Sequence, residues 1–257
     1  MGKVLKVRSL EIGSGLPKII APIVGASHEE ILNKTKELSD MKIDMVEWRA
    51  DFFDNIFDTG QVLSLLLEMR KALKEMPLLF TFRTKNEGGQ KEISIEGYKE
   101  LNVAVAKSGE ADFVDVEVFL DDGAAVQIID AVHATERFVV GSNHDFNSTP
   151  PKDELVRRLR RMQDVGADIA KIAVMPTSMA DVLELLSATN EMHEHYAKIP
   201  LITMSMSSKG VVSRIAGGVF GSSMTFGAVG QVSAPGQIAV DELARALDIL
   251  HGHSDSK

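Results

Sequence analysis

The sequence predicts an α/β protein in which eight parallel strands close into a (β/α)₈ barrel. Short apolar runs rich in Val, Ile and Phe alternate with longer segments of helical periodicity from end to end. Eight such units favour a closed barrel over an open doubly wound sheet, and 257 residues is a common length for this barrel. Neither a G-x-G-x-x-G fingerprint after the first strand nor a Walker A sequence occurs, which counts against the open-sheet nucleotide folds.

The expected elements follow one another in a regular order. Residues 4–12 alternate in polarity without a helix signal, so we expect a short β-hairpin that closes the bottom of the barrel. The barrel strands are expected near residues 18–25, 43–49, 77–84, 112–118, 137–144, 169–175, 200–206 and 222–228. The helices that follow these strands are expected near residues 28–40, 60–75, 95–108, 122–134, 152–164, 179–196, 209–219 and 236–250.

Local signals support several of these helices. Ser27 precedes an acidic first turn, as an N-cap residue does. Asp153 opens an amphipathic stretch that closes at Gly166. No linker divides the chain, so we expect a single domain over residues 1–257, with 251–257 as a polar, frayed tail.

The composition excludes several classes of function. The chain has no cysteine, which rules out disulfides, thiolate zinc sites, iron–sulfur clusters and a cysteine nucleophile. The net charge of −9, with basic and acidic residues interspersed, argues against a nucleic-acid partner. No apolar run approaches the ~20 residues of a membrane span, and the N-terminus does not have the shape of a signal peptide. We therefore expect a cytoplasmic protein without a membrane partner.

Polar side chains interrupt the apolar strands or follow them closely. In this fold the catalytic groups lie at the carboxyl ends of the strands, so these positions are the candidates for a site. They are Glu47, Arg49, Arg83, Glu87, Asp115, Glu117, His144, Lys171, Arg214, Ser233 and Gln237.

Lys171 lies within the apolar run of the sixth strand and not on a helix surface. Burial disfavours the charged form of an amine, and a neutral amine can attack a ketone to form an imine. The alternative is a structural ion pair with Asp115 or Glu117, two carboxylates that share one face of the fourth strand.

His144 ends the fifth strand. The ordinary histidine pKa of about 6.5 suits a general base at neutral pH. The alternative is a polar histidine in a loop, with no role in chemistry.

Arg49, Arg83 and Arg214 come from different units and would converge at the top of the barrel. Guanidinium forks suit carboxylates, so such a cluster favours an anionic substrate, whereas three separate salt bridges are the alternative. Met204 and Met206 are expected to pack and not to bind a metal, and they would form an apolar wall if they face inward.

Two segments resemble the signature of the type I 3-dehydroquinate dehydratases: Asp115-Val116-Glu117-Val118 and, after the expected spacer, Val139-Val140-Gly141-Ser142-Asn143-His144-Asp145. Further segments agree in order over nearly the whole chain, and several separated motifs are more specific than any one of them. These are Glu47-Trp48-Arg49-Ala50-Asp51, Phe82-Arg83, Lys171, Met204-Ser205-Met206, Arg214 and Ser233-Ala234-Pro235-Gly236-Gln237.

The resemblance implies a (β/α)₈ barrel that removes water from 3-dehydroquinate to give 3-dehydroshikimate. That reaction belongs to the shikimate pathway of aromatic amino acid biosynthesis. The resemblance also implies that no metal or organic cofactor takes part and that the protein is a homodimer.

Each matching residue acquires an expected role from the resemblance. Lys171 would form a Schiff base with the substrate ketone, and His144 would remove the adjacent carbon proton and later help to protonate the departing hydroxyl. Glu87 would interact with His144, and Arg214 would clamp the carboxylate. The groups for the substrate hydroxyls and carboxylate would be Glu47, Arg49, Arg83, Ser233 and Gln237, with segment 230–237 as a loop that closes over the substrate.

One position departs from part of the family. Some members carry a hydroxyl residue near the end of the first strand, where this chain has Ala21-Pro22-Ile23. The contribution of the first strand to the site therefore stays open.

Three other functions are compatible with the residues. A class I aldolase of a sugar phosphate also uses a Schiff base, and its phosphate site would lie in the glycine-rich region 217–236 after the last strands. A non-catalytic barrel would use the arginines for an acidic ligand, but would have no use for a lysine in an apolar strand. A metal-dependent barrel would lose activity with a chelator, and its ligands would be Glu47, Asp115, Glu117 and His144.

Overall fold

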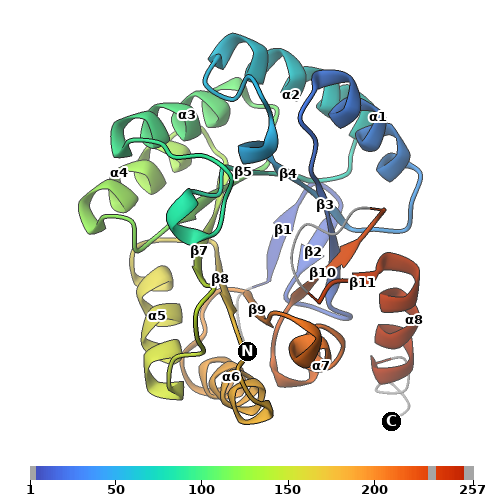
Figure 1. The fold of residues 1–257 in the computed structure, drawn as a ribbon, viewed down its shortest axis with the longest axis vertical. Helices are drawn as coiled ribbons and strands as arrows, with labels where there is room; N and C mark the ends of the chain where they lie inside the picture. Colours follow the sequence, from blue (N-terminus) through green and yellow to red (C-terminus); the bar gives the residue numbers. More distant parts are fainter. Residues whose placement is uncertain (1–3, 231–235, 252–257) are drawn as a thin grey trace.

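Eight parallel strands curve into a barrel, and helices cover its outer face (Figure 1). The computed structural model describes residues 4–230 and 236–251. The barrel strands are β3 (Lys18–Ile23), β4 (Met45–Arg49), β5 (Leu78–Thr81), β6 (Phe113–Glu117), β7 (Phe138–Asp145), β8 (Ile169–Val174), β9 (Leu201–Ser205) and β10 (Met224–Ala228). The helices are α1 (His28–Ser39), α2 (Thr59–Leu73), α3 (Ile95–Ser108), α4 (Asp122–His133), α5 (Lys152–Asp164), α6 (Met179–Glu191), α7 (Val211–Ala216) and α8 (Val240–His251).

Parallel ladders join the strands in the order β10-β3-β4-β5-β6-β7-β8-β9. The ring closes between β9 and β10, where Leu201 and Ser222 form a parallel bridge. Nearby, the Ser223 N–H donates to the Leu201 carbonyl at 2.7 Å. The predicted (β/α)₈ barrel is therefore confirmed. Because all eight strands run in one direction, their carboxyl ends open on a single face.

The predicted N-terminal hairpin is also present. β1 (Leu5–Val7) pairs antiparallel with β2 (Leu10–Ile12). Apolar side chains of the hairpin pack in the barrel interior against residues near the starts of the strands, among them Ile20, Met45 and Phe113. The hairpin thus closes the amino-terminal end of the barrel and lies behind the strands in Figure 1.

The later helical segments depart from the prediction. The helix expected over 209–219 is reduced to α7, with 3₁₀ turns at Ser208–Gly210 and Gly217–Phe220 on either side. Glycine weakens a regular helix, and this stretch is rich in it. α6 ends at Glu191, and residues Met192–Tyr196 form a π turn where the prediction continued the helix.

The prediction of a helix from residue 236 was wrong. Gly236 has a φ of 77°, which a right-handed helix does not allow, and Ile238–Ala239 form a two-residue strand, β11, that pairs with β10. His251 was expected in the tail but is the last residue of α8, while residues 252–257 lie outside the described residues. Within the described ranges, no helix combines the length and apolar character that crossing a bilayer requires.

Candidate active site

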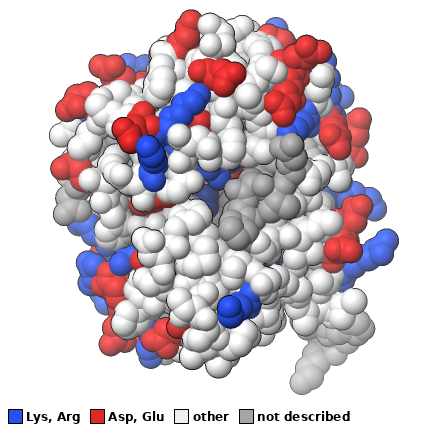
Figure 2. All heavy atoms as spheres, in the orientation of Figure 1, with Lys and Arg blue, Asp and Glu red and all other residues white. Residues whose placement is uncertain are grey.

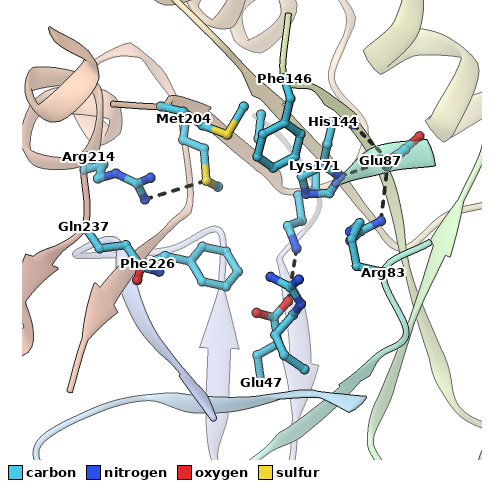
Figure 3. A pocket seen from close by; sticks show the side chains of 13 residues that line it. Glu47, Arg83, Glu87, His144, Phe146, Lys171, Met204, Arg214, Phe226 and Gln237 are labelled. Carbon is cyan, nitrogen blue, oxygen red and sulfur yellow. Dashed lines mark hydrogen bonds and ion pairs between the residues drawn. The ribbon is translucent and has the colours of Figure 1, made fainter. Parts of the chain in front are cut away.

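The carboxyl ends of the strands surround a pocket inside the barrel (Figure 3). In Figure 2, basic atoms lie recessed in a hollow near the middle of this face, while charges of both signs surround it. Ser233 and its neighbours 231–235 lie outside the described residues. Two further candidates, Asp115 and Glu117, are buried and are not among the residues that line the pocket. The remaining predicted site residues line it: Glu47, Arg49, Arg83, Glu87, His144, Lys171, Met204, Met206, Arg214 and Gln237.

Lys171 projects from β8 into this pocket, and only 3% of the residue is exposed. Its Nζ lies 3.1 Å from Glu47 Oε1 and 3.3 Å from Asp115 Oδ2. The same nitrogen lies 4.8 Å from the centre of the Phe226 ring. Two carboxylates and an aromatic face thus compensate the burial of a cation at this point. The lysine is ion-paired, as one hypothesis held, and it also lines the pocket, as imine chemistry requires.

A second buried cation, Arg83, faces the two carboxylates of β6. Its Nη2 lies 2.8 Å from Asp115 Oδ2, and its Nη1 lies 2.9 Å from Glu117 Oε1. Burial opposes the charge of Arg83, but Asp115 and Glu117 hold its pKa well above the usual value. Glu117 therefore pairs with the arginine, whereas Asp115 lies between the arginine and Lys171.

Glu87 fixes the orientation of His144. Glu87 Oε2 lies 2.9 Å from His144 Nδ1 and accepts the backbone N–H of the same residue at 2.9 Å. Glu87 Oε1 accepts a hydrogen bond from Asn143 Nδ2 at 3.0 Å. Because Nδ1 is engaged, Nε2 is the ring nitrogen that remains for proton transfer in the pocket.

The pKa values of this pair move in opposite directions. Burial lowers the pKa of His144 well below its ordinary value, and the positive charges of Arg83 and Lys171 lower it further. The imidazole is therefore neutral at neutral pH, which is the form that accepts a proton. Burial, together with the charge of Glu117, raises the pKa of Glu87 to about 8. Opposite shifts in two groups that share a hydrogen bond are typical of a functional site.

The structure brings the three predicted arginines together at one pocket. Asp51 holds Arg49 through two hydrogen bonds, from Nε at 2.9 Å and from Nη2 at 3.0 Å. Arg214 is 1% exposed, and burial lowers its pKa to about 10, so its guanidinium stays charged at neutral pH. Its Nη1 lies 3.7 Å from the sulfur of Met204. The pocket can therefore receive an anionic ligand.

Apolar residues complete the lining. Met204 and Met206 are buried and both line the pocket, so they form the predicted wall. Sequence reasoning missed Phe146, Ala173 and Phe226. Ala173 and Phe146 stand two residues after Lys171 and His144, so strand alternation was the signal that could have found them. Phe226 lies within an apolar strand and carries no such signal.

The carboxylates considered as metal ligands are engaged by cations of the protein itself. Glu47 and Asp115 accept hydrogen bonds from Lys171, and Glu117 accepts one from Arg83. Over residues 4–230 and 236–251, no group of three or more His, Asp or Glu side chains is arranged to hold a metal ion. Residues 21–23, where the chain lacks the hydroxyl residue of some family members, are not among the described residues that line the pocket.

Comparison with known proteins identifies the family. A sequence model described as type I 3-dehydroquinase matches residues 19–254. A 3-dehydroquinate dehydratase of Bacillus licheniformis is 50% identical over 251 residues, which cover 98% of this chain and 99% of that protein. A 3-dehydroquinate dehydratase of Clostridioides difficile is 49% identical over 98% of both chains. The chain belongs to the type I 3-dehydroquinase family.

Solved structures of type I 3-dehydroquinases share this fold. The type I 3-dehydroquinate dehydratase of Clostridium difficile, solved with covalently modified comenic acid, superposes with a TM-score of 0.95. It is 48% identical and covers 98% of this chain and 99% of its own. A 3-hexulose-6-phosphate synthase, at 18% identity and a TM-score of 0.57, shows a likeness of fold alone. The family predicted from the motifs is therefore confirmed, and the aldolase alternative gains no support beyond the barrel.

In this type I 3-dehydroquinase, Glu87 is expected to make stability depend on pH. Folding raises its pKa from 4.5 to about 8, so the folded protein holds this proton more tightly than the unfolded chain. The resulting stability is present below pH 4.5 and is lost as the pH rises through about 8. Glu87→Gln cannot ionise. We therefore expect its free energy of unfolding, relative to wild type, to rise by on the order of 2–4 kcal/mol between about pH 5 and about pH 9.

Urea unfolding of both proteins at the two pH values measures this difference. His144 is present in both proteins, so its own titration largely cancels from the comparison. A difference in free energy of unfolding that is the same at both pH values would contradict the raised pKa of Glu87.

Proposed function

We propose that this protein dehydrates 3-dehydroquinate to 3-dehydroshikimate through an imine on Lys171. One observation carries the proposal: a buried lysine amine and a neutral, oriented histidine line the same pocket from neighbouring strands, β8 and β7. The family and the names of its relatives agree with this reaction.

The imine forms when Lys171 Nζ adds to the substrate ketone and one water leaves. The protonated imine is a cation at the position of the former ammonium. Glu47 and Asp115, which lie within 3.3 Å of Nζ, are therefore placed to stabilise it. The iminium acidifies the neighbouring carbon–hydrogen bond more than a ketone does, since it accepts the electron pair that the lost proton leaves behind.

His144 removes that proton, and the result is an enamine. The electron pair of the enamine then expels the hydroxyl one carbon further along, and His144 returns the proton so that water departs. This step leaves the conjugated imine. Hydrolysis of the imine consumes one water and frees Lys171, so the net change is the loss of one water. Glu87 keeps the imidazole in a single orientation through both proton transfers.

The arginines orient the substrate. Arg214 lies across the pocket from the Glu87–His144 pair in Figure 3, where it can bind the carboxylate at the far end of the substrate. Arg49, Glu47 and Gln237 are placed for the remaining polar groups, and Ser233 stays a prediction outside the described residues. Arg83 reaches the pocket but is occupied by three carboxylates, so we assign it mainly to holding Asp115, Glu117 and Glu87.

Turnover of 3-dehydroquinate tests the proposal. The product has a conjugated double bond and absorbs ultraviolet light, whereas the substrate lacks this conjugation. We expect absorbance to rise equally with and without a chelator. Loss of activity with the chelator and its recovery with a divalent cation would support the metal-dependent barrel instead. Cleavage of a sugar phosphate without any reaction of 3-dehydroquinate would support the aldolase. The homodimer, the cytoplasmic address and the place in the shikimate pathway stay predictions.

Replacing Arg214 by alanine is expected to raise KM by roughly 10- to 100-fold, the scale of a charge-assisted hydrogen bond of about 1.5–3 kcal/mol. The effect on kcat should be smaller, because Arg214 binds the far end of the substrate and does not touch the reacting atoms. Steady-state kinetics measures both values. Arg160→Ala, at a surface position outside the pocket where the guanidinium covers the Tyr196 ring, is the matched control. A KM of Arg214→Ala within twofold of wild type would contradict the assignment.

A further inference from the structure

We infer that Tyr98 is a positioning residue for this reaction. It is a buried tyrosine of α3 that does not line the pocket. Its hydroxyl takes the place of a strand residue where β5 separates from β6. The inference rests on the proposed dehydratase function. It concerns how the carboxylates of β6 are held.

The ladder between β5 and β6 is short. It pairs Leu79 with Phe113 and Phe80 with Val114 and then stops. On its other side β6 continues to pair with β7 as far as Glu117. Continuing the β5 register would set Phe82 opposite Val116. The N–H and C=O of Phe82 would then bond the backbone on either side of Val116.

The Tyr98 hydroxyl makes these two bonds instead. It accepts the N–H of Glu117 at 3.0 Å and donates to the carbonyl of Asp115 at 3.2 Å. Tyr98 is 0% exposed, and its ring packs edge-on against that of Phe82 at 6.3 Å between centres. Burial, with the charges of Glu117 and Asp115, raises the pKa of Tyr98 well above its ordinary value, so the hydroxyl keeps its proton and remains a donor.

The separation of the strands has a use at the site. Beyond the ladder, the chain after β5 turns so that Thr84 donates to Glu117 from its backbone N–H at 2.8 Å and from its hydroxyl at 2.7 Å. Arg83 reaches Glu117 and Asp115 from the same turn. Glu87 follows in the 3₁₀ turn that begins at Lys85. A regular β5–β6 ladder would leave no room for this arrangement, because Phe82 would occupy the edge of β6.

Tyr98 therefore acts through the two residues whose backbone it holds. The Asp115 carboxylate lies 3.3 Å from Lys171 Nζ, and the Glu117 charge contributes to the raised pKa of Glu87. A small movement of β6 would change the surroundings of the imine nitrogen and of the Glu87–His144 pair together. The substrate contacts assigned to Arg214 and Gln237, on the opposite side of the pocket, would not change (Figure 3).

Tyr98→Phe tests the inference because it removes one oxygen and keeps the ring. We expect kcat to fall on the order of 10- to 100-fold, the range that a misplaced catalytic group produces, while KM stays within about threefold. We also expect the pH dependence of kcat to shift, since the charges that set the protonation of Glu87 have moved. Tyr196→Phe is the matched control: Tyr196, the other tyrosine of the chain, is 38% exposed and lies in the π turn outside the pocket.

Circular dichroism and thermal unfolding show whether Tyr98→Phe is folded at the assay temperature. A folded variant with wild-type kcat and an unchanged pH profile would overturn the inference, since a purely structural role predicts that outcome. If the variant does not fold, 3-fluorotyrosine is incorporated in place of tyrosine in the Tyr196→Phe protein, where residue 98 is the one tyrosine left. The fluorine makes the hydroxyl of residue 98 a weaker hydrogen-bond acceptor. A lower kcat at unchanged KM then supports the positioning role, and an unchanged kcat overturns it. No turnover by wild type or Tyr196→Phe would overturn the proposed function itself.

Discussion

Replacing Lys171 by alanine is expected to lower kcat by roughly 10⁴-fold or more, the scale on which loss of a covalent nucleophile acts. The reason is that no imine can form, so the proton must be removed from the carbon beside an unmodified ketone, which acidifies it less than an iminium does. The neutral His144 and the arginines would remain, and they would sustain only the small residual rate that positioning provides. Product absorbance at saturating 3-dehydroquinate measures the loss.

Alanine at 171 also breaks the buried ion pairs of the lysine with Glu47 and Asp115, although Asp115 keeps its pair with Arg83. Breaking a buried ion pair costs about 3–5 kcal/mol. Lys171→Arg is the companion variant, because it keeps a positive charge beside both carboxylates but has no nucleophilic amine. We expect it to be the more stable of the two and equally inactive. Turnover by Lys171→Arg within tenfold of wild type would mean that the lysine acts as a charge and not as a nucleophile.

Replacing His144 by asparagine is expected to lower kcat by about 10²- to 10⁴-fold, the usual contribution of a general base. Imine formation should survive, because Lys171 and its two carboxylates are untouched. The pH profile carries a second expectation. Since the pKa of His144 is lowered, the wild-type rate should hold as the pH falls through the ordinary histidine value of about 6.5, and should be lost only at lower pH.

The matched control is His195→Asn, the same change at an exposed position of the π turn between α6 and β9. It should leave both kcat and the pH profile unchanged. If His144→Asn also retained the wild-type rate at neutral pH, another group would have to remove the proton, and the assignment of the base would be wrong.

The barrel was predictable because its strands are buried on both faces and therefore read as apolar runs. Against that background a polar residue is conspicuous, which is why Lys171, His144 and Glu47 could be identified from the chain alone. The conformation of residues 209–219 and 236–239, in the last two strand–helix units, was harder to predict. Their glycines permit several backbone conformations, and tertiary contacts decide among them.

The pairing of charges was not predictable. Asp115 and Glu117 share a strand face, and either could have met Lys171. The turn after β5 decides the outcome, since it brings Arg83 onto Glu117 and leaves Asp115 beside the lysine. Tyr98 was equally hidden, because a tyrosine at core spacing in a helix looks like any packing residue. Only the interrupted β5–β6 ladder shows what its hydroxyl does.

The central claim is the imine on Lys171, and mass spectrometry after borohydride reduction in the presence of 3-dehydroquinate tests it most directly. We expect one reduced adduct, mapped by peptide digestion to Lys171, absent without substrate and absent from Lys171→Ala. His144→Asn should still give the adduct, which would separate imine formation from proton removal. No adduct in a wild-type protein that still produces 3-dehydroshikimate would contradict the imine, and an adduct on another lysine would move the reaction to a different residue.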